Sequence, residues 1–173
     1  HSFLSSLRRE GKMYACRCSR RLLGLAGRSK SGQEKLRYPG TCRDLCLPWA
    51  FENGRLPSWR LRVGKEFGDH TGDVVLRRAD GFIAYHLATV IDELTLGISE
   101  VVRGEDLIAA LNMQLAVIDS ISQVNLTYKH VPLMVNELGN KLSKRDGSEG
   151  LARLRANGMS SSQVVGLLAS SLG

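Results

Sequence analysis

The change of hydrophobic period between residues 98 and 118 constrains the fold more than any other feature of the sequence. Ile98–Val102 is predicted to be a strand, Arg103-Gly104-Glu105-Asp106 a turn, and the apolar residues that follow recur at helical spacing. Asp106 is placed to cap that helix. A strand, a Gly-containing turn and a helix are how a parallel α/β sheet presents a ligand site at the carboxyl ends of its strands. The sequence therefore predicts an α/β fold with Arg103 at a ligand-binding edge, and a solvated arginine is the alternative.

Further segments with helical or strand-like hydrophobic spacing lie before and after residues 98–118. Apolar spacing predicts helices near residues 3–7, 84–91, 107–118, 151–154 and 159–168, and strands at 13–16, 59–63 and 131–135. The segment 59–63 alternates apolar and basic residues, so we expect it to be half-exposed, whereas 131–135 is predicted to be buried. Asp80-Gly81 lies between short apolar runs and is the strongest short hairpin signal available.

Length and composition bound the class of protein. A chain of 173 residues with 43% hydrophobic content is expected to form a globular domain with its own core. No apolar run approaches the roughly 20 residues of a membrane helix, and no leader for secretion is recognisable, so we expect a cytoplasmic protein without a membrane partner. The net charge of +7 favours a polyanionic partner such as nucleic acid, although solubility alone explains the charge equally well.

All four cysteines lie within the first 46 residues of the chain, at Cys16, Cys18, Cys42 and Cys46. Because a chain of this length has its own core and shows no secretory leader, these residues indicate a metal site better than a disulfide framework. Reduced cysteines buried without a metal are the alternative. Two close pairs brought together by a loop are the usual way to supply zinc with four ligands. On chemistry alone, Cys46 is the natural fourth ligand, because tyrosine rarely binds zinc.

The segment Lys141-Leu142-Ser143-Lys144-Arg145-Asp146-Gly147 places two lysines three residues apart on a short loop. Two mobile ammonium groups over one small volume suit a triphosphate, whose charge is spread over several oxygens. A lysine-rich loop that is merely solvated is the alternative.

Four segments resemble a single family in their order along the chain. They are Cys16-x-Cys18 with Tyr38-x-x-x-Cys42-Arg43, the block 80–93, the segment 101–107 and the loop Lys141-Leu142-Ser143-Lys144. Together they resemble the glutamyl-tRNA synthetases of class I, in which the loop is the KMSKS signature. The resemblance implies a partial, Rossmann-like catalytic domain of a class I synthetase with a small inserted zinc-knuckle subdomain like an acceptor-binding domain. It divides the chain into residues 1–72 (the end of the first Rossmann half with the knuckle), 73–147 (the second half) and 148–173 (a helical segment).

Within that family, the ending of the chain and the tyrosine of the knuckle resemble the truncated paralogues, the glutamyl-queuosine tRNA(Asp) synthetases. These enzymes activate glutamate with ATP and attach it to the queuosine base in the anticodon of tRNA(Asp). The resemblance implies a zinc site made of Cys16, Cys18, Tyr38 and Cys42, with Cys46 in reserve. It also implies tRNA(Asp) as the partner of a monomeric enzyme.

The same resemblance implies roles for residues outside the knuckle. Tyr85 and Arg103 would bind glutamate, Arg103 through a bidentate pair with a carboxylate. Lys144, together with Lys141, would bind the ATP phosphates and stabilise the pyrophosphate as it leaves, with Mg²⁺ accompanying the nucleotide.

The first signature of the family, His-x-Gly-His, does not occur in this sequence. We therefore expect residues ahead of His1 to supply part of the nucleotide site, and residues 1–173 alone to form no adenylate. Two alternatives stay open. One is a catalytic fragment of an ordinary glutamyl-tRNA synthetase that charges tRNA(Glu), and the other is a basic, zinc-bearing nucleic-acid-binding module without catalysis.

Overall fold

The fold is that of a computed structural model, which describes residues 2–19, 21–22, 37–122, 124–135, 141–142 and 150–171. The chain divides into two compact units. The first contains residues 1–101 and 109–127, and the second contains 102–108 and 128–173. Lys144 and the rest of the signature loop after Leu142 lie outside the described residues, as does the segment 23–36.

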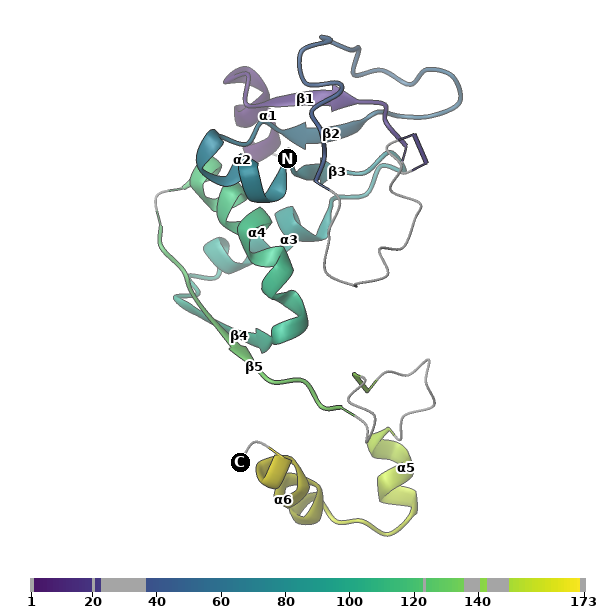
Figure 1. Ribbon diagram of the computed structural model, residues 1–173, viewed down its shortest axis with the longest axis vertical. Helices are drawn as coiled ribbons and strands as arrows, with labels where there is room; N and C mark the ends of the chain where they lie inside the picture. Colours follow the sequence, from purple (N-terminus) through teal and green to yellow (C-terminus); the bar gives the residue numbers. More distant parts are fainter. Residues whose placement is uncertain are drawn as a thin grey trace. The chain divides into compact units, whose positions relative to one another are not determined.

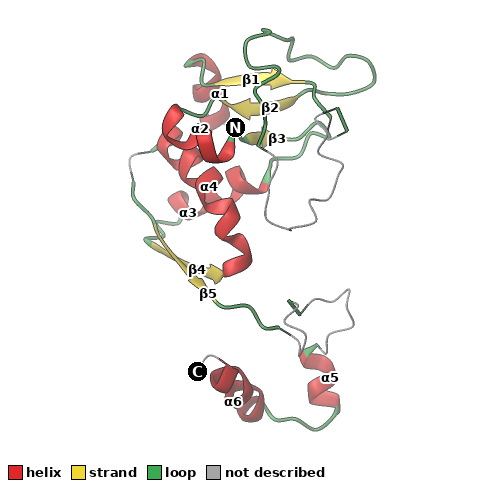
Figure 2. Ribbon diagram, viewed as in Figure 1, coloured by secondary structure: helices red, strands yellow, loops and turns green. Residues whose placement is uncertain are grey.

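The first unit is built on a three-stranded sheet in the order β1–β2–β3. Both pairs of strands are antiparallel, with Met13 opposite Leu61 and Cys16 opposite Ser58 in the first pair. Helices lie together beside this sheet (Figure 1 and Figure 2). The elements are α1 (Ser2–Arg9), β1 (Met13–Cys16), β2 (Ser58–Leu61), α2 (Lys65–Thr71), β3 (Val75–Arg77), α3 (Tyr85–Thr95) and most of α4 (Ile108–Ile121).

The core of the first unit forms where the predicted apolar faces meet the sheet. α1 packs against β1 and α3 packs against β3. Leu7 of α1, Val90 of α3 and Leu76 of β3 are almost completely removed from solvent. Burying a side chain of this size stabilises the fold by roughly 1.5–3 kcal/mol. The predicted helices near 3–7 and 84–91 and the predicted strand at 13–16 are therefore confirmed.

The hairpin predicted at Asp80-Gly81 is also present. Gly81 has a φ of +94°, and an antiparallel bridge joins Arg77 to Ile83 across the turn. The N–H of Arg78 donates to the carbonyl of Phe82 at 2.8 Å. This turn leads directly into α3, so it sets where that helix begins.

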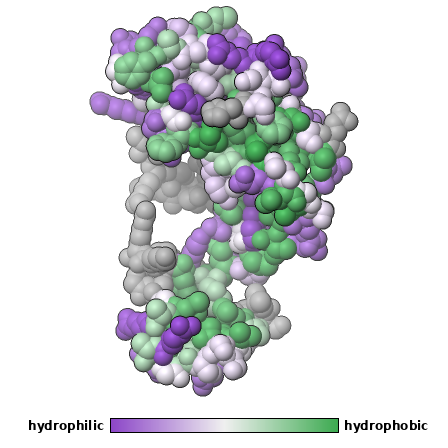
Figure 3. Space-filling view, turned by 180° about the vertical axis from the view of Figure 1, so that it is seen from behind, coloured by the Kyte–Doolittle hydropathy of each residue, from purple (hydrophilic) through white to green (hydrophobic). Residues whose placement is uncertain are grey.

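The second unit contains the ends of two paired strands and two C-terminal helices. β4 (Glu100–Gly104) pairs with β5 (Thr127–Val131), and a short 3₁₀ helix, η1 (Glu105–Leu107), follows β4. The helices are α5 (Leu151–Ala156) and α6 (Ser161–Ser171), as the sequence predicted. Hydrophobic side chains reach the surface on the face that Figure 3 shows, and Leu151 is 70% exposed.

The predicted buried strand at 131–135 is wrong in both position and burial. The strand ends at Val131, and Val135 forms only an isolated bridge with Lys141. Met134 and Val135 are exposed. Pro132 explains the early end, because proline has no backbone N–H to donate to a ladder.

The α/β class of the fold is confirmed, and the parallel sheet of a Rossmann domain stays a prediction. Within the described residues, no helix is long and apolar enough to cross a membrane.

Candidate metal centre and substrate site

Four predicted ligands converge at the end of β1. Cys16 is the last residue of β1, and Cys18 follows two residues later. Tyr38 bridges to Gly72, and a turn at Pro39-Gly40 returns the chain to Cys42. The three sulfur atoms all lie within 4.8 Å of one another. The hydroxyl of Tyr38 lies 3.3 Å from the Sγ of Cys16 and 3.8 Å from that of Cys18.

These distances fit a tetrahedral metal ion. A zinc–sulfur bond of about 2.3 Å implies sulfur–sulfur separations of about 3.8 Å in a tetrahedron. The Sγ atoms of Cys18 and Cys42 are 3.4 Å apart, so a small outward movement accommodates the ion. Cys46, the reserve ligand, is exposed and does not belong to this cluster. Its φ of +48° places this residue in the left-handed region of backbone conformation.

The surroundings shift the pKa values of Cys16 and Cys18 in opposite directions. Burial raises the pKa of the Cys16 thiol, but hydrogen bonds with Tyr38 and Arg60 outweigh burial and lower it to about 7. Burial and the contact with Cys42 instead raise the pKa of Cys18 to about 11. Burial also raises the pKa of Tyr38, helped by its hydrogen bond with Cys16. A thiol with a lowered pKa provides the thiolate that a metal requires.

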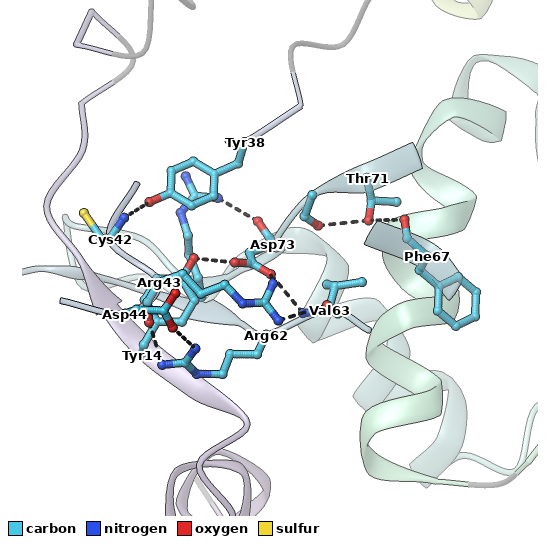
Figure 4. Close-up of polar contacts among 12 residues, drawn as sticks. Tyr14, Tyr38, Cys42, Arg43, Asp44, Arg62, Val63, Phe67, Thr71 and Asp73 are labelled. Carbon is cyan, nitrogen blue, oxygen red and sulfur yellow. Dashed lines mark hydrogen bonds and ion pairs between the residues drawn. The ribbon is translucent and has the colours of Figure 1, made fainter. Parts of the chain in front are cut away.

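A buried carboxylate holds the segment after Cys42 against the sheet (Figure 4). Asp73 accepts hydrogen bonds from the hydroxyl of Tyr14 at 2.6 Å, from Nη1 of Arg43 at 2.6 Å and from the N–H of Val63 at 2.9 Å. The carboxylate side chain is only 2% exposed. Because Arg43 directly follows Cys42, this network positions one of the candidate ligands.

No sequence pattern singles out Asp73, and the pattern around Arg60 is misleading. The alternation in 59–63 predicted a half-exposed strand, yet Arg60 is only 9% exposed. Its Nε donates to the Sγ of Cys16 at 3.3 Å, and its guanidinium lies over the ring of Tyr38. Burial of a charged side chain depends on partners distant in sequence, and here they come from the knuckle. An arginine in alternation with apolar residues was the available signal, and it is ambiguous.

Tyr85, a predicted glutamate ligand, lines an open cavity beside the knuckle. The cavity has a volume of about 620 Å³, and its lining includes Cys18, Ser19, Arg55, Arg78, Tyr85 and His86. This volume lies within the range of roughly 300–1,000 Å³ that is usual for small-molecule sites. Tyr85 is the first residue of α3 and is 53% exposed. Its ring makes an edge contact with His86 at a centroid distance of 5.7 Å. A phenol in the lining of such a cavity can donate a hydrogen bond to a small polar ligand or accept one from it.

Arg103, the other predicted glutamate ligand, lies on β4 in the second unit. Its Nε donates to Nε2 of His130 at 3.1 Å, and Nη2 donates to the carbonyl of Leu107 at 3.4 Å. The guanidinium lies over the ring of Tyr128, 4.7 Å from its centroid. Side chains of β5 therefore orient this cation.

Lys141, a predicted phosphate ligand, also belongs to the second unit. Its ammonium pairs with the carboxylate of Asp106, and this contact lowers the pKa of Asp106. Asp106 lies within η1, and the residue that caps η1 is Gly104, without a side-chain bond. The predicted capping role of Asp106 is therefore wrong, because η1 leads directly into α4 (Ile108–Ile121) and Asp106 lies inside the helical segment that begins after Gly104.

Comparison with known proteins assigns the chain to a family. Residues 62–168 match the family described as tRNA synthetases class I (E and Q), catalytic domain. A curated Glutamyl-Q tRNA(Asp) synthetase of Prochlorococcus marinus (strain MIT 9313) is 64% identical over 171 residues, which are 99% of this chain and 55% of that protein. Another of Nocardia farcinica (strain IFM 10152) is 39% identical over 184 residues, covering 98% of this chain and 59% of that protein.

A solved structure shares the fold. The glutamate tRNA ligase of Elizabethkingia meningosepticum superposes with a TM-score of 0.62 at 19% identity, over 84% of this chain and 34% of that one. The chain thus spans about half the length of the curated relatives that it matches. On the family match over residues 62–168, the chain belongs to the class I tRNA synthetases of the E and Q type and carries part of their catalytic domain.

Proposed function

We propose that the full-length protein activates glutamate with ATP and transfers the glutamyl group to the queuosine base in the anticodon of tRNA(Asp). The observation that carries this proposal is the 64% identity, over 171 residues, to a relative named Glutamyl-Q tRNA(Asp) synthetase. Named relatives from several other organisms support it. The net charge of +7 suits a polyanionic substrate.

The proposed chemistry relies on positioning more than on acid–base groups. The α-carboxylate of glutamate attacks the α-phosphorus of ATP, and pyrophosphate leaves. Arg103 pairs with a carboxylate of glutamate and Tyr85 binds its polar head. Lys144 and Lys141 hold the phosphates, and Mg²⁺ accompanies ATP. The contacts of Arg103 with His130 and Tyr128 support this role, because an oriented guanidinium loses less freedom on binding.

We further propose that Cys16, Cys18, Tyr38 and Cys42 hold a structural zinc ion. Four protein ligands form a closed site, which zinc uses to stabilise a fold. The knuckle then belongs to a zinc subdomain within residues 1–72, followed by a second catalytic half (73–147) and a helical end (148–173). The convergence of three Sγ atoms and one phenol oxygen supports this assignment.

The decisive experiment measures glutamylation by the full-length protein. Glutamate-dependent ATP–pyrophosphate exchange, followed by glutamyl transfer to queuosine-containing tRNA(Asp), is the expected result. Transfer to tRNA(Glu) instead identifies an ordinary glutamyl-tRNA synthetase. Binding of tRNA without any pyrophosphate exchange identifies a non-catalytic binding module.

Replacing the proposed glutamate ligand tests the site directly. We expect Arg103→Ala to remove about 2–5 kcal/mol of transition-state binding, which lowers exchange about 30-fold or more, while the zinc content stays that of the wild type. Lys129→Ala is the matched control. It removes a positive charge from β5, the strand that pairs with β4, and should retain exchange. Exchange retained by Arg103→Ala removes this residue from the site.

The zinc assignment has its own matched pair of variants. Cys18→Ser should lose stoichiometric zinc, because serine supplies no thiolate, whereas Cys46→Ser should keep it. Metal analysis of the purified proteins measures both. A full zinc atom per chain in Cys18→Ser contradicts the proposed ligand set.

A further inference from the structure

Arg60 is a buried cation that directs its charge at the candidate metal centre. Its Nε donates to the Sγ of Cys16 at 3.3 Å, and its Nη1 donates to the carbonyl oxygen of Asp73 at 2.7 Å. The Cζ atom lies 3.6 Å from the centroid of the Tyr38 ring. One guanidinium therefore contacts two of the four candidate ligands, and it comes from strand β2, where Arg60 lies opposite Tyr14 of β1.

Within the described part of the chain, Arg60 forms no ion pair with a carboxylate. The carbonyl that Arg60 contacts belongs to Asp73, but the carboxylate of Asp73 pairs with Arg43 instead. A buried charge without a partner of opposite sign costs several kcal/mol. The groups that contact the guanidinium of Arg60 are a sulfur atom, an aromatic ring and a backbone carbonyl oxygen, none of which is a carboxylate.

A metal centre of this composition supplies the missing negative charge. Three thiolates carry more charge than a divalent ion neutralises, so the loaded site is anionic whether Tyr38 is a phenol or a phenolate. An anionic centre in a partly buried position needs a nearby cation or hydrogen-bond donors. The planar guanidinium provides both at once, since it donates to sulfur along its edge and stacks on the ring with its face.

We propose that Arg60 is a positioning residue of the zinc centre, which supplies the counter-charge for the Cys16 thiolate and holds the ring of Tyr38 toward the metal. This inference rests on the proposed zinc site. It assigns to β2 a function beyond the sheet, because that strand carries the group that stabilises the loaded knuckle.

The test compares three variants of the full-length protein. Arg60→Gln keeps a hydrogen-bond donor but removes the charge. Arg60→Lys keeps the charge, but an ammonium group cannot both donate to the sulfur of Cys16 and stack flat on the ring of Tyr38. Arg62→Gln is the matched control, because Arg62 also lies over a tyrosine ring, that of Tyr14 at 5.0 Å, but pairs with Asp44. Zinc affinity is measured by competition with a chelator, and thiolate coordination by the absorption spectrum of the cobalt-substituted protein.

We expect Arg60→Gln to bind zinc about 10- to 100-fold more weakly than the wild type. Its cobalt–thiolate absorption should change as well, which a role in packing alone does not predict. Arg60→Lys should lie between Arg60→Gln and the wild type, and Arg62→Gln should match the wild type.

Each other outcome has a definite meaning. Wild-type affinity and an unchanged cobalt spectrum in Arg60→Gln overturn the role of Arg60 and leave the zinc site in place. A wild-type protein that binds no zinc overturns both proposals. Circular dichroism checks that the variants fold. Should Arg60→Gln fail to fold, Arg60→Lys decides, since affinity equal to that of the wild type overturns the proposal.

Discussion

At the scale of single residues, the buried carboxylate of Asp73 connects three segments that are distant in sequence. It accepts hydrogen bonds from Tyr14 on β1, from Arg43 next to the candidate ligand Cys42 and from the backbone N–H of Val63 (Figure 4). A carboxylate with three donors is well satisfied, so its burial is tolerated. Removal of its charge leaves those donors poorly paired.

We predict that Asp73→Asn lowers the free energy of unfolding by about 2–4 kcal/mol, since the buried carboxylate loses the charge that Tyr14, Arg43 and the N–H of Val63 bind. Asp44→Asn is the matched control. Asp44 also pairs with an arginine, Arg62 at 3.0 Å, but its side chain is 86% exposed, so its loss should cost less than about 1 kcal/mol. Urea denaturation measures both, and equal losses contradict the prediction.

A second prediction at this scale concerns pH. Zinc binds thiolates, so protons on the cysteines compete with the metal. With a pKa of about 11, Cys18 must release its proton on binding at neutral pH, and below about pH 7 Cys16 must do so too. Zinc affinity should therefore rise with pH and fall more steeply below about 7. Chelator competition across this range measures the effect, and an affinity independent of pH refutes it.

At the scale of elements, the contact between two loops sets the position of the tyrosine ligand. Tyr38 and Gly72 form a parallel bridge, and Gly72 has a φ of +62°. A Cβ at this glycine would lie 2.7 Å from the carbonyl oxygen of Tyr38 and 2.9 Å from its nitrogen. Both atoms belong to the backbone, so the segment that carries Tyr38 has to move to admit any side chain.

We predict that Gly72→Ala weakens zinc binding and costs more stability than Gly11→Ala. Gly11 has a similar φ of +66°, but nothing lies within 4 Å of its added Cβ. Its substitution therefore isolates the backbone strain, roughly 1–3 kcal/mol, from the collision with Tyr38. Urea denaturation and metal analysis distinguish the two variants. Identical zinc affinity in both would show that Tyr38 does not depend on this contact.

At the scale of the whole molecule, the net charge of +7 bears on the proposed binding of tRNA. Each phosphate contact releases counterions, so the logarithm of the affinity should fall linearly with the logarithm of the salt concentration. We predict a steep decrease for tRNA bound to the full-length protein, measured by filter binding. Glutamate activation, which involves no RNA, should change far less. A tRNA affinity that does not depend on salt rules out this electrostatic contribution.

Local patterns in the sequence were sufficient for much of the fold. The helices α1, α3, α4, α5 and α6 and the strand β1 follow hydrophobic period, which depends on near neighbours. The pattern failed at 131–135, where an apolar run suggested a buried strand although Pro132 ends the ladder. It also failed for the carboxylate of Asp106, whose partner Lys141 lies 35 residues away.

The sequence by itself determined the positions of α1, α3, α4, α5 and α6 and the excess of positive charge. Its likeness to one family singled out the candidate ligands Cys16, Cys18, Tyr38 and Cys42. Only the tertiary structure decided that Cys46 stands apart from the other three cysteines. It also decided that Arg60 and Asp73 are buried. The physical reason is that a charged side chain leaves water only where opposite charge or hydrogen-bonding groups await it, and in this protein those groups come from segments up to 59 residues apart.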